Sequence, residues 1–474
     1  MRRTRTVALL TLALINVFTL AAGVAVARML PPRLAALRVP EVSPAQVSAA
    51  GHVLNADPAS GAMPTASGLQ SALSGPLSSS ALGSPVAALV TDPATGRVLW
   101  SQNPDQLATP ASTTKLATSL AALAMLGPGA RFTTKVVQGA SLGTIVLVGG
   151  GDPTLAVNAY PSQDYPQPAT LASLAAATAS KLKAEHRTKV TLTYDTSLYS
   201  GPGLAPGWSE SYVSTGDVTP ISSLEVDQGR LSSGKPEDSD DPYNLRPRSD
   251  DPAGVAAGAF ASLLGRDGID VAPGTAQHTA PAHAPAVASV SSPPLSAMVQ
   301  QMLEESNNVI AENLARHVAL AAGQPASFAS AAAAEISELR HLGVTTGVQL
   351  VDGSGLSPQD GIAPASLVKA VELAMAEPRL RSILAGLPVA GFSGTLSAGQ
   401  SVFAGISGAA RGSVRAKTGN LSTVTALAGT VADKSGSTLA FAFMADRIPS
   451  AGLLDEAADA IDQAAAALAN CGCQ

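Results

Sequence analysis

Three short polar motifs, widely separated in the sequence, constrain the fold of this chain more than any other feature. Ser112-Thr113-Thr114-Lys115 comes first, Ser306-Asn307-Asn308 follows 194 positions later, and Lys417-Thr418-Gly419 lies near the C-terminus. Each pattern alone is weak, because Ser-x-x-Lys occurs four times, Ser-x-Asn twice, and Lys followed by Thr or Ser and then Gly also twice. As an ordered set they carry more weight, since they require a fold that brings distant parts of the chain to one place.

The residues before Ser112 predict a strand hairpin that leads into a helix. Val86–Val90 and Arg97–Trp100 are strand-like runs on either side of turn residues, which favours an antiparallel pair. Thr109 is expected to cap the following helix, with Pro110 at its first position. Ser112 should therefore lie in the first turn of a helix.

Ser112 and Lys115 have the spacing of a nucleophile and its base. Residues three apart on a helix project from one face, so the amine can lie beside the hydroxyl. Free N–H groups and the helix dipole at a helix start also favour negative charge there. An acyl-transfer enzyme needs a hydroxyl, a group that takes its proton, and donors for the oxyanion.

The other two motifs fall in different predicted elements. Ser306 lies between helical patterns that run from Leu295 to Leu320, and Lys417 ends a strand. The C-terminal part is expected to contain a helix near Ala365–Ala376, strands at Ser413–Thr418, Thr423–Val431 and Thr438–Ala445, a turn at Gly419-Asn420 and a helix at Leu453–Leu468.

The remaining matches are interpreted as accidental. Ser180 lies in an Ala/Lys-rich helical stretch and Ser232 in a turn. Ser366 is the strongest competitor, because Pro364-Ala365-Ser366-Leu367-Val368-Lys369 echoes the first motif. No Ser-x-Asn lies between Ser366 and Lys417, so the ordered set is incomplete there.

With its further motifs, the chain resembles the D-alanyl-D-alanine carboxypeptidase/endopeptidase family of low-molecular-mass penicillin-binding proteins. This is the class C group, similar to penicillin-binding protein 4 and called peptidase family S13. The resemblance covers nearly everything from Pro85 to Ala445. Besides the three motifs it rests on Gly151-Asp152-Pro153-Thr154-Leu155, Asp195-Thr196-Ser197, Gly207-Trp208, Ser292-Pro293-Pro294-Leu295, Asp352-Gly353-Ser354-Gly355-Leu356-Ser357, Gly394-Thr395-Leu396 and Val414-Arg415-Ala416.

The resemblance implies an α/β fold of the β-lactamase/transpeptidase-like kind, with an antiparallel sheet flanked by helices, a helical subdomain and an inserted domain. The transpeptidase-like domain is expected to be discontinuous, at residues 83–134 and 288–470. Residues 135–287, which we call the insert, alternate short strand-like and helical runs. The insert is expected to restrict or orient the peptidoglycan strand without contributing a catalytic group.

The resemblance also implies roles for individual residues. Ser112 would form the acyl-enzyme and Lys115 would accept its proton. Ser306 and Asn308 would relay protons and position the substrate amide. No metal and no cofactor is expected, because Lys115 can act as the base.

Substrate binding is expected at the third motif. Lys417 and Thr418, followed by Gly419 and Asn420, would hold the terminal carboxylate, with the backbone N–H groups of Ser112 and Asn420 as oxyanion donors. Two positions depart from the family pattern: Asn420 stands in place of Thr, and Pro358 in place of Arg. Asp152 is expected either to meet an ammonium group of the stem peptide or simply to fix its own turn.

The N-terminus predicts export from the cytoplasm. Basic residues precede an uncharged apolar run from Val7 to Ala27, so residues 1–27 are a signal peptide or an uncleaved membrane anchor. Residues 28–82 are rich in Ala, Pro and Ser and are interpreted as a linker. The protein is expected in the cell wall or periplasmic space, secreted or held by this anchor.

The net charge and the positions of the cysteines limit which partners and which cross-links are expected. A net charge of −6 gives no basic footprint for nucleic acid. Cys471 and Cys473 lie in the last four residues, cannot cross-link the core, and are interpreted as a tail.

The function expected is therefore a penicillin-sensitive serine D-alanyl-D-alanine carboxypeptidase, with possible endopeptidase action, whose partners are the peptidoglycan stem peptide and, as covalent inhibitors, β-lactams. The alternatives are a β-lactam-hydrolysing enzyme of the same fold and a catalytically idle wall-binding protein.

Overall fold

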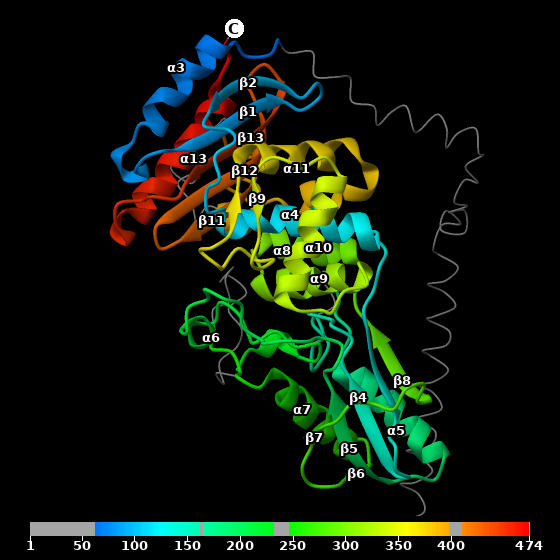
Figure 1. The fold of residues 1–474 in the computed structure, drawn as a ribbon. Coiled ribbons are helices and arrows are strands. Elements are labelled where there is room, and N and C mark those ends of the chain that lie inside the picture. Colours follow the sequence, from blue (N-terminus) through cyan, green and yellow to red (C-terminus); the bar gives the residue numbers. More distant parts are fainter. Residues whose placement is uncertain (1–61, 162–164, 232–245, 398–409, 474) are drawn as a thin grey trace, which may run out of the picture. The chain divides into compact units, whose positions relative to one another are not determined.

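The computed structural model describes residues 62–161, 165–231, 246–397 and 410–473 (Figure 1). The predicted export signal, residues 1–27, lies outside them, as does the predicted linker before residue 62. In the part that is described, no helix is long and apolar enough to cross a membrane.

A five-stranded antiparallel sheet carries the third motif. Its order is β11-β12-β13-β1-β2, so the hairpin near the N-terminus pairs directly with β13 from the C-terminal part. The strands confirm the predicted hairpin and the three predicted C-terminal strands. Their bounds are β1 Ala87–Asp92, β2 Arg97–Gln102, β11 Val414–Leu421, β12 Val424–Ala432 and β13 Thr438–Ala445.

The turn predicted at Gly419-Asn420 was wrong. Both residues belong to β11, where Gly419 pairs with Ala426 and Asn420 with Thr425 of β12. The turn comes after Leu421, because pairing with the neighbouring strand overrides the local turn preference of Gly and Asn.

The side chains of β13 alternate between two apolar cores, one on each side of the sheet. Both faces of the sheet are therefore buried. Ala440, Ala442 and Met444 join a core with α4 (Thr114–Leu126) and α11 (Pro364–Ala376). Leu439, Phe441 and Phe443 join a core with α3 (Ala66–Leu77) and α13 (Leu454–Asn470). Figure 1 shows α3 and α13 together on one face of the sheet, and α11 on the other.

Helices pack against the first of these cores and confirm those predicted near 295–320 and 365–376. They are α4, α8 Leu295–Glu304, α9 Asn308–Ala321, α10 Phe328–His341, α11 and the short α12 Ser382–Gly386. Shorter elements connect them: η5 Pro378–Leu380, η6 Gly394–Leu396, η8 Ala451–Leu453, and the pair β9 Val348–Gln349 and β10 Gly361–Ile362.

A second sheet, of order β6-β5-β4-β3-β8 with β7 beside β5, is built from residues 133–291 and so extends slightly beyond the limits predicted for the insert. The helices α5 Leu171–Ala184 and α7 Pro252–Arg266 bury its apolar side chains in a core of their own. Its strands are β3 Thr133–Gln138, β4 Thr144–Val148, β5 Lys189–Asp195, β6 Asp270–Val271, β7 Ala276–Gln277 and β8 Ala286–Ser291.

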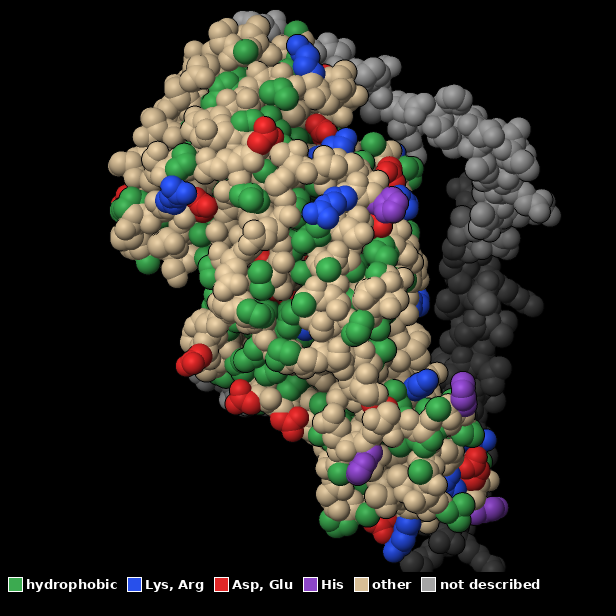
Figure 2. Space-filling model, in the orientation of Figure 1, with side chains coloured by type: hydrophobic (Ala, Val, Ile, Leu, Met, Phe, Trp, Pro, Cys, Tyr) green, Lys and Arg blue, Asp and Glu red, His purple; other side chains and the backbone are tan. Residues whose placement is uncertain are grey.

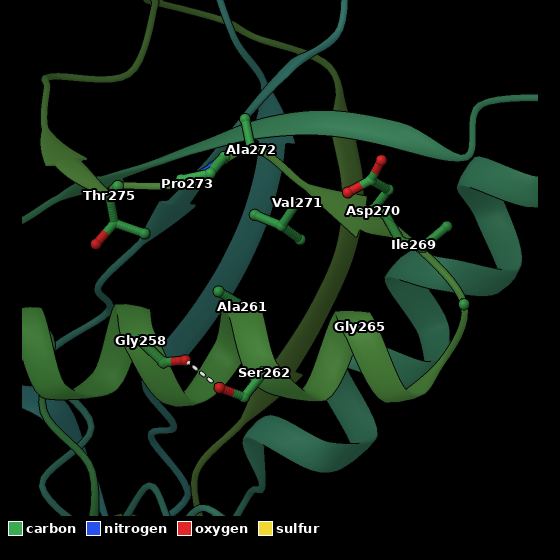
Figure 3. Close-up of a pocket in the computed structure, with 12 residues that line it drawn as sticks. Gly258, Ala261, Ser262, Gly265, Ile269, Asp270, Val271, Ala272, Pro273 and Thr275 are labelled. Carbon is green, nitrogen blue, oxygen red and sulfur yellow. Dashed lines mark hydrogen bonds between the residues drawn. The ribbon is translucent and has the colours of Figure 1, made fainter.

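The surface of the insert has a shallow groove between α7 and the segment that carries β6 (Figure 3). Small residues of α7, among them Gly258, Ala261 and Gly265, line one side of it.

On the face of the molecule shown in Figure 2, charged side chains of both signs are scattered among neutral ones, in keeping with a charged content of 14%.

Between β5 and α7 the chain forms irregular structure that packs against α9. We call residues 199–231 and 246–249 the strap. Its described residues contain the short helices α6 Tyr212–Thr215 and η4 Asp227–Gly229.

The linker prediction was wrong for residues 62–82. Thr65 caps α3 by accepting a hydrogen bond from the Gly68 N–H, and the short helix η2 Ser80–Leu82 follows. Leu69, Leu73 and Leu77 repeat every four residues and are buried in the sheet core. This apolar stripe was missed because the linker prediction relied on the Ala- and Ser-rich composition of the segment.

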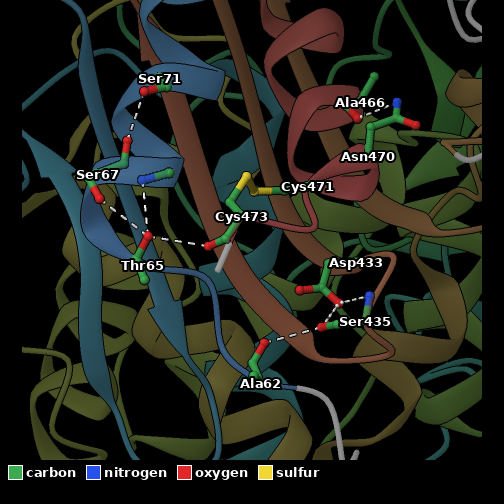
Figure 4. The surroundings of a disulfide bond; sticks show 11 residues. Ala62, Thr65, Ser67, Ser71, Asp433, Ser435, Ala466, Asn470, Cys471 and Cys473 are labelled. Carbon is green, nitrogen blue, oxygen red and sulfur yellow. Dashed lines mark hydrogen bonds between the residues drawn. A yellow bond between two sulfur atoms is a disulfide. The ribbon is translucent and has the colours of Figure 1, made fainter.

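The C-terminal cysteines do more than end the chain, which corrects their interpretation as a tail. Cys471 and Cys473 form a disulfide at the end of α13 (Figure 4), and Cys471 is buried in the same core as residues of α3 and α13. The Thr65 N–H donates to the carbonyl of Cys473, at 2.8 Å. A Cβ on Gly68 would lie 2.4 Å from the Cβ of Cys473, so the approach of α3 to this loop requires glycine.

Replacing Leu73 by Ala should destabilise the protein by about 2–5 kcal/mol, because a fully buried leucine is removed from a packed core. Ser74→Ala, on the exposed side of the same helix, is the matched control and should leave stability nearly unchanged. Denaturant unfolding measures both. Equal stability of the two variants would show that Leu73 is not packed in a core and that this segment is a linker.

Candidate active site

The amine of Lys115 lies at the meeting point of the first two motifs. Its Nζ is 2.9 Å from Ser112 Oγ, 2.7 Å from Asn308 Oδ1 and 2.8 Å from the backbone oxygen of Ser354. Lys115 is fully buried and Ser112 is half-buried. The structure therefore brings Ser112, Lys115 and Asn308 together as the sequence predicted.

The geometry explains how this amine can act as a base. A neutral amine has two N–H groups and one lone pair. The oxygens of Asn308 and Ser354 can only accept hydrogen bonds, so they take both N–H groups. The lone pair is then left for the O–H of Ser112, which is the arrangement that proton removal from the nucleophile requires.

The electrostatics of Lys115 favour this neutral form. Burial lowers the pKa of its amine from 10.5 to about 7, while the nearby charges of Asp352 and Glu312 oppose the shift. A base with a pKa near the working pH combines a large deprotonated fraction with useful basicity.

Ser112 does not lie in the first turn of a capped α-helix. It belongs to η3, a 3-10 helix of residues Ala111–Thr113 that precedes α4. Thr109 makes no cap: its N–H donates to Asp446 Oδ2 and its hydroxyl to the carbonyl of Pro358. Ala111 has a φ of 47°, a left-handed conformation that costs a non-glycine residue about 1–3 kcal/mol. The tertiary contacts of Thr109 and the packing of η3 hold this tight turn in place of a regular cap.

Ser306 lies in the short loop between α8 and α9, as predicted. Its φ is 56°, again left-handed, and its side chain is half-buried. Asn307 caps α9, because its Oδ1 accepts from the Ile310 N–H at 3.1 Å. The cap places Asn308 in the first turn of α9, where its amide faces Lys115.

Lys417 is fully buried in β11, with its Nζ donating to the carbonyl of Thr418 at 2.9 Å. Burial and then the nearby Lys115 hold the pKa of its amine well below the usual value. The Thr418 and Thr395 hydroxyl oxygens lie 2.7 Å apart. Asn420 Oδ1 accepts from the Thr425 hydroxyl at 2.9 Å.

Gly419 allows β11 to rest directly on the turn that carries Ser112. A Cβ at this position would lie 2.5 Å from the carbonyl oxygen of Pro110 and 3.1 Å from the N atom of Ser112. Side chains larger than hydrogen would push the strand away from Ser112. This close approach brings the first and third motifs together.

Sequence reasoning recognised the motif Asp352–Ser357 but assigned it no role. Asp352 Oδ1 accepts from the N–H groups of Ser354 and Gly355, and its Oδ2 from Trp208 Nε1 and the Ser357 N–H. The loop therefore holds the Ser354 carbonyl that faces Lys115. The run of glycine and serine after an aspartate was the available signal, since such a loop can fold around a carboxylate.

Glu312, one turn after Asn308 on α9, was also missed. Its Oε1 accepts from the N–H groups of Gly353 and Ser354, at 3.1 and 2.8 Å. Burial raises the pKa of this carboxyl to about 8. Glu312 thus binds the same loop, and the Ser354 N–H donates to both Glu312 and Asp352.

Asp152 lies away from these groups. Its Oδ1 accepts from both the N–H and the hydroxyl of Thr154, and its carboxyl is buried. The adjacent Gly151 carbonyl contacts His317, which lies nine positions beyond Asn308, or about 14 Å along α9. This geometry favours the turn-fixing role over contact with an ammonium group.

Ser366, the competing match, is placed differently from Ser112. Its hydroxyl donates to the Thr346 carbonyl, and it is buried. Lys369 is partly exposed and its Nζ lies 4.0 Å from Glu372. The match lacks a hydroxyl free to react.

Comparison with known proteins agrees with the family that the sequence motifs resemble. The sequence profile of the D-Ala-D-Ala carboxypeptidase 3 (S13) family matches residues 69–237 and 233–468. The carboxypeptidase DacB of Mycolicibacterium smegmatis is 37% identical over 415 residues, which cover 86% of this chain and 85% of that protein. A carboxypeptidase of Mycobacterium tuberculosis is 37% identical over 431 residues, covering 90% and 88%.

A solved structure shares the fold. The crystal structure of penicillin-binding protein 4 from Haemophilus influenzae superposes with a TM-score of 0.64 at 23% identity, covering 81% of this chain and 94% of that one. The α/β arrangement described above, with an antiparallel sheet flanked by helices, is therefore the fold of that protein.

The rate at which a β-lactam acylates Ser112 should rise with pH through about 7 and level off above it, because Lys115 must lose its proton to act as the base. Lys115→Arg keeps the charge but cannot lose a proton at these pH values, so it should lower the rate by roughly 10²–10⁴-fold. Stopped-flow acylation between pH 5 and 9 measures both. A profile that is flat from pH 6 to 8 would contradict the assignment of Lys115 as base.

Proposed function

The chain belongs to the D-Ala-D-Ala carboxypeptidase 3 (S13) family, and we propose that Ser112 is the nucleophile with which it cleaves D-alanyl-D-alanine bonds of peptidoglycan stem peptides. The observation that carries the proposal is the buried amine of Lys115. This amine lies within hydrogen-bond distance of Ser112, and the carbonyl oxygens of Asn308 and Ser354 orient it.

Acylation begins with proton transfer from Ser112 to Lys115. Ser112 Oγ forms a bond to the carbonyl carbon of the penultimate D-alanine, and the carbonyl oxygen becomes an oxyanion. The N–H groups of Ser112 and Asn420 are the proposed donors for this oxyanion. Collapse breaks the peptide bond, and the departing amine of the last D-alanine takes a proton from Lys115 by way of Ser306.

Water completes the reaction. With Lys115 again neutral, its amine accepts a proton from a water molecule that attacks the ester carbon. The Ser112–carbon bond breaks, the Ser112 oxygen regains a proton, and the shortened stem peptide leaves. The Asn308 amide positions the substrate amide next to Lys115.

Lys417 and Thr418 are proposed to hold the terminal carboxylate of the substrate. A buried ammonium without an anion is costly, which is the reason for the low pKa of Lys417. A carboxylate brought next to it supplies the missing opposite charge and favours the protonated form. The Thr418 hydroxyl, on the same strand, adds a neutral donor.

β-Lactams are proposed to acylate the same serine. The H. influenzae relative has also been crystallised in complex with a β-lactam, in a structure that superposes with a TM-score of 0.59 at 22% identity. In this chain the half-buried Ser112 and the buried Lys115 provide the nucleophile and base that opening of a β-lactam ring needs.

We further propose that the protein works outside the cytoplasm, at the cell wall. The basic residues and the apolar run before residue 28 support export, and any attachment to the membrane is through this segment.

Ser112→Ala should abolish covalent labelling by a fluorescent penicillin, whereas Ser366→Ala should leave it intact, because the Ser366 hydroxyl is bound to the Thr346 carbonyl. Gel fluorescence followed by peptide mapping measures the labelling and its position. Labelling that survives in Ser112→Ala would overturn the proposed function.

Lys417→Ala should impair substrates that end in a free carboxylate more than their carboxamide counterparts. A hydrogen bond to a charged group contributes about 1.5–3 kcal/mol, so the carboxylate substrate should lose roughly 10- to 150-fold more in kcat/KM. Paired peptides that differ only in this terminal group provide the control. An equal loss for both would show that Lys417 does not bind the carboxylate.

A further inference from the structure

The insert is hydrogen-bonded to the helix that starts at the second motif. Side chains at Asn307 and along α9 make these contacts at successive turns. They are Asn307 Nδ2 to Gln228 Oε1 (2.8 Å), Asn308 Nδ2 to the Asp217 carbonyl (2.9 Å), Asn313 Nδ2 to Glu225 Oε1 (2.9 Å), Tyr199 Oη to Asn313 Oδ1 (2.9 Å) and His317 Nε2 with the Gly151 carbonyl (2.9 Å).

Asn308 connects the strap to the catalytic amine. Its Oδ1 accepts from Lys115, while its Nδ2 donates to the backbone carbonyl of Asp217. The second bond fixes which way the amide faces, because a rotated amide would turn its NH₂ toward the N–H groups of Lys115 and its oxygen toward the Asp217 carbonyl. The backbone position of Asp217 therefore orients the acceptor that holds the Lys115 amine.

Arg248 binds the backbone next to Asp217, where the Asp217 N–H also donates to the Tyr212 carbonyl. Its guanidinium is almost fully buried, with Nε donating to the carbonyl of Gly216 and Nη1 to the carbonyl of Gln228, both at 2.9 Å. Its own N–H donates to the Val213 carbonyl. One side chain thus ties together the two strap segments that contact Asn307 and Asn308.

The strap has little freedom at this point. Gly216 has a φ of 94°, and a Cβ there would lie 2.4 Å from the Arg246 carbonyl oxygen. The segment 246–249 is therefore in direct backbone contact with the turn before Asp217. Removing the guanidinium would leave the Gly216 and Gln228 carbonyls without these donors and would loosen the turn.

The charge of Arg248 is compatible with this role. Burial lowers the pKa of its guanidinium to about 9, with Arg230 acting in the same direction and Glu225 and Asp217 opposing it. The group is still protonated at neutral pH and has all its N–H donors. Charged donors bind backbone carbonyls more strongly than neutral ones do.

We infer that Arg248 is a positioning residue for acylation of Ser112: through Asp217 and Asn308 it orients the amine of Lys115. This inference rests on the function proposed above. It revises the expectation that the insert only restricts or orients the peptidoglycan strand, because the strap belongs to the support of the catalytic base. The hydrogen bonds of Arg248 described above all run to backbone carbonyls of the strap and not to Ser112.

The test is a double-mutant cycle in the complete protein. Arg248→Met, Asn308→Ala and the double variant are compared with the parent by stopped-flow acylation with a fluorescent penicillin. Arg248→Met should lower the limiting acylation rate constant roughly 10-fold, with less than about 2-fold change in the non-covalent dissociation constant. In the Asn308→Ala background the same change should lower the rate less than about 2-fold, because the connection is already cut.

Two controls separate positioning from loss of stability. Phe260→Leu disturbs the buried core of the insert far from Asn308 in sequence and should lower the melting temperature without changing the acylation rate. Arg266→Met removes an exposed arginine from α7 and should change neither. Arg248→Lys, which keeps the charge but not the fork of donors, should give an intermediate acylation rate and provides the cycle if Arg248→Met does not fold.

The outcomes are distinct. Equal losses from Arg248→Met in the parent and in Asn308→Ala would overturn the inference, as would an unchanged acylation rate or a rate that follows the melting temperature across all variants. Ser112→Ala labelling tests the proposed function separately: failure of the proposed function would leave Ser112→Ala labelled, whereas failure of this inference would leave labelling dependent on Ser112.

Discussion

The burial of one amine is the constraint on which the rest of this site depends. Lys115 is enclosed on all sides, and removal from water makes its charged form costly, so its pKa falls to about 7. That cost is useful only if the neutral amine is held in one orientation. The carbonyl oxygens of Asn308 and Ser354 provide this orientation, and the lone pair is directed toward Ser112.

Much of the surrounding structure supports these two oxygens. Asp352 and Glu312 bind the backbone of the loop that carries Ser354, while α9 and the strap hold the Asn308 amide. On the remaining side, Gly419 lets β11 approach the turn of Ser112 closely enough to complete the site. Segments separated by hundreds of residues thus converge because each binds a different side of one short 3-10 turn and the helix after it.

Local sequence patterns were reliable where a single element carried the signal and unreliable where a neighbour decided the outcome. The hairpin of β1 and β2 and the three C-terminal strands were predicted from strand-like runs beside turn residues, although the turn expected at Gly419-Asn420 was wrong. Thr109 has the chemistry of a helix cap, yet its hydrogen bonds go to Asp446 and Pro358. The segment of α3 reads as a linker by composition, although its leucines are buried against the sheet.

The sequence by itself determined which residues are proposed to react: a serine and a lysine three residues apart, an amide downstream, and a lysine on a late strand. The order of these groups, together with the further motifs, indicated the family. Only the tertiary structure decided that burial lowers the pKa of Lys115 to about 7, that the Ser354 carbonyl faces its amine, and that Arg248 binds the turn before Asp217. The physical reason is that a pKa and a hydrogen-bond direction depend on the exclusion of water and on backbone groups from distant segments. The spacing of residues along the sequence specifies neither the pKa nor the hydrogen-bond direction.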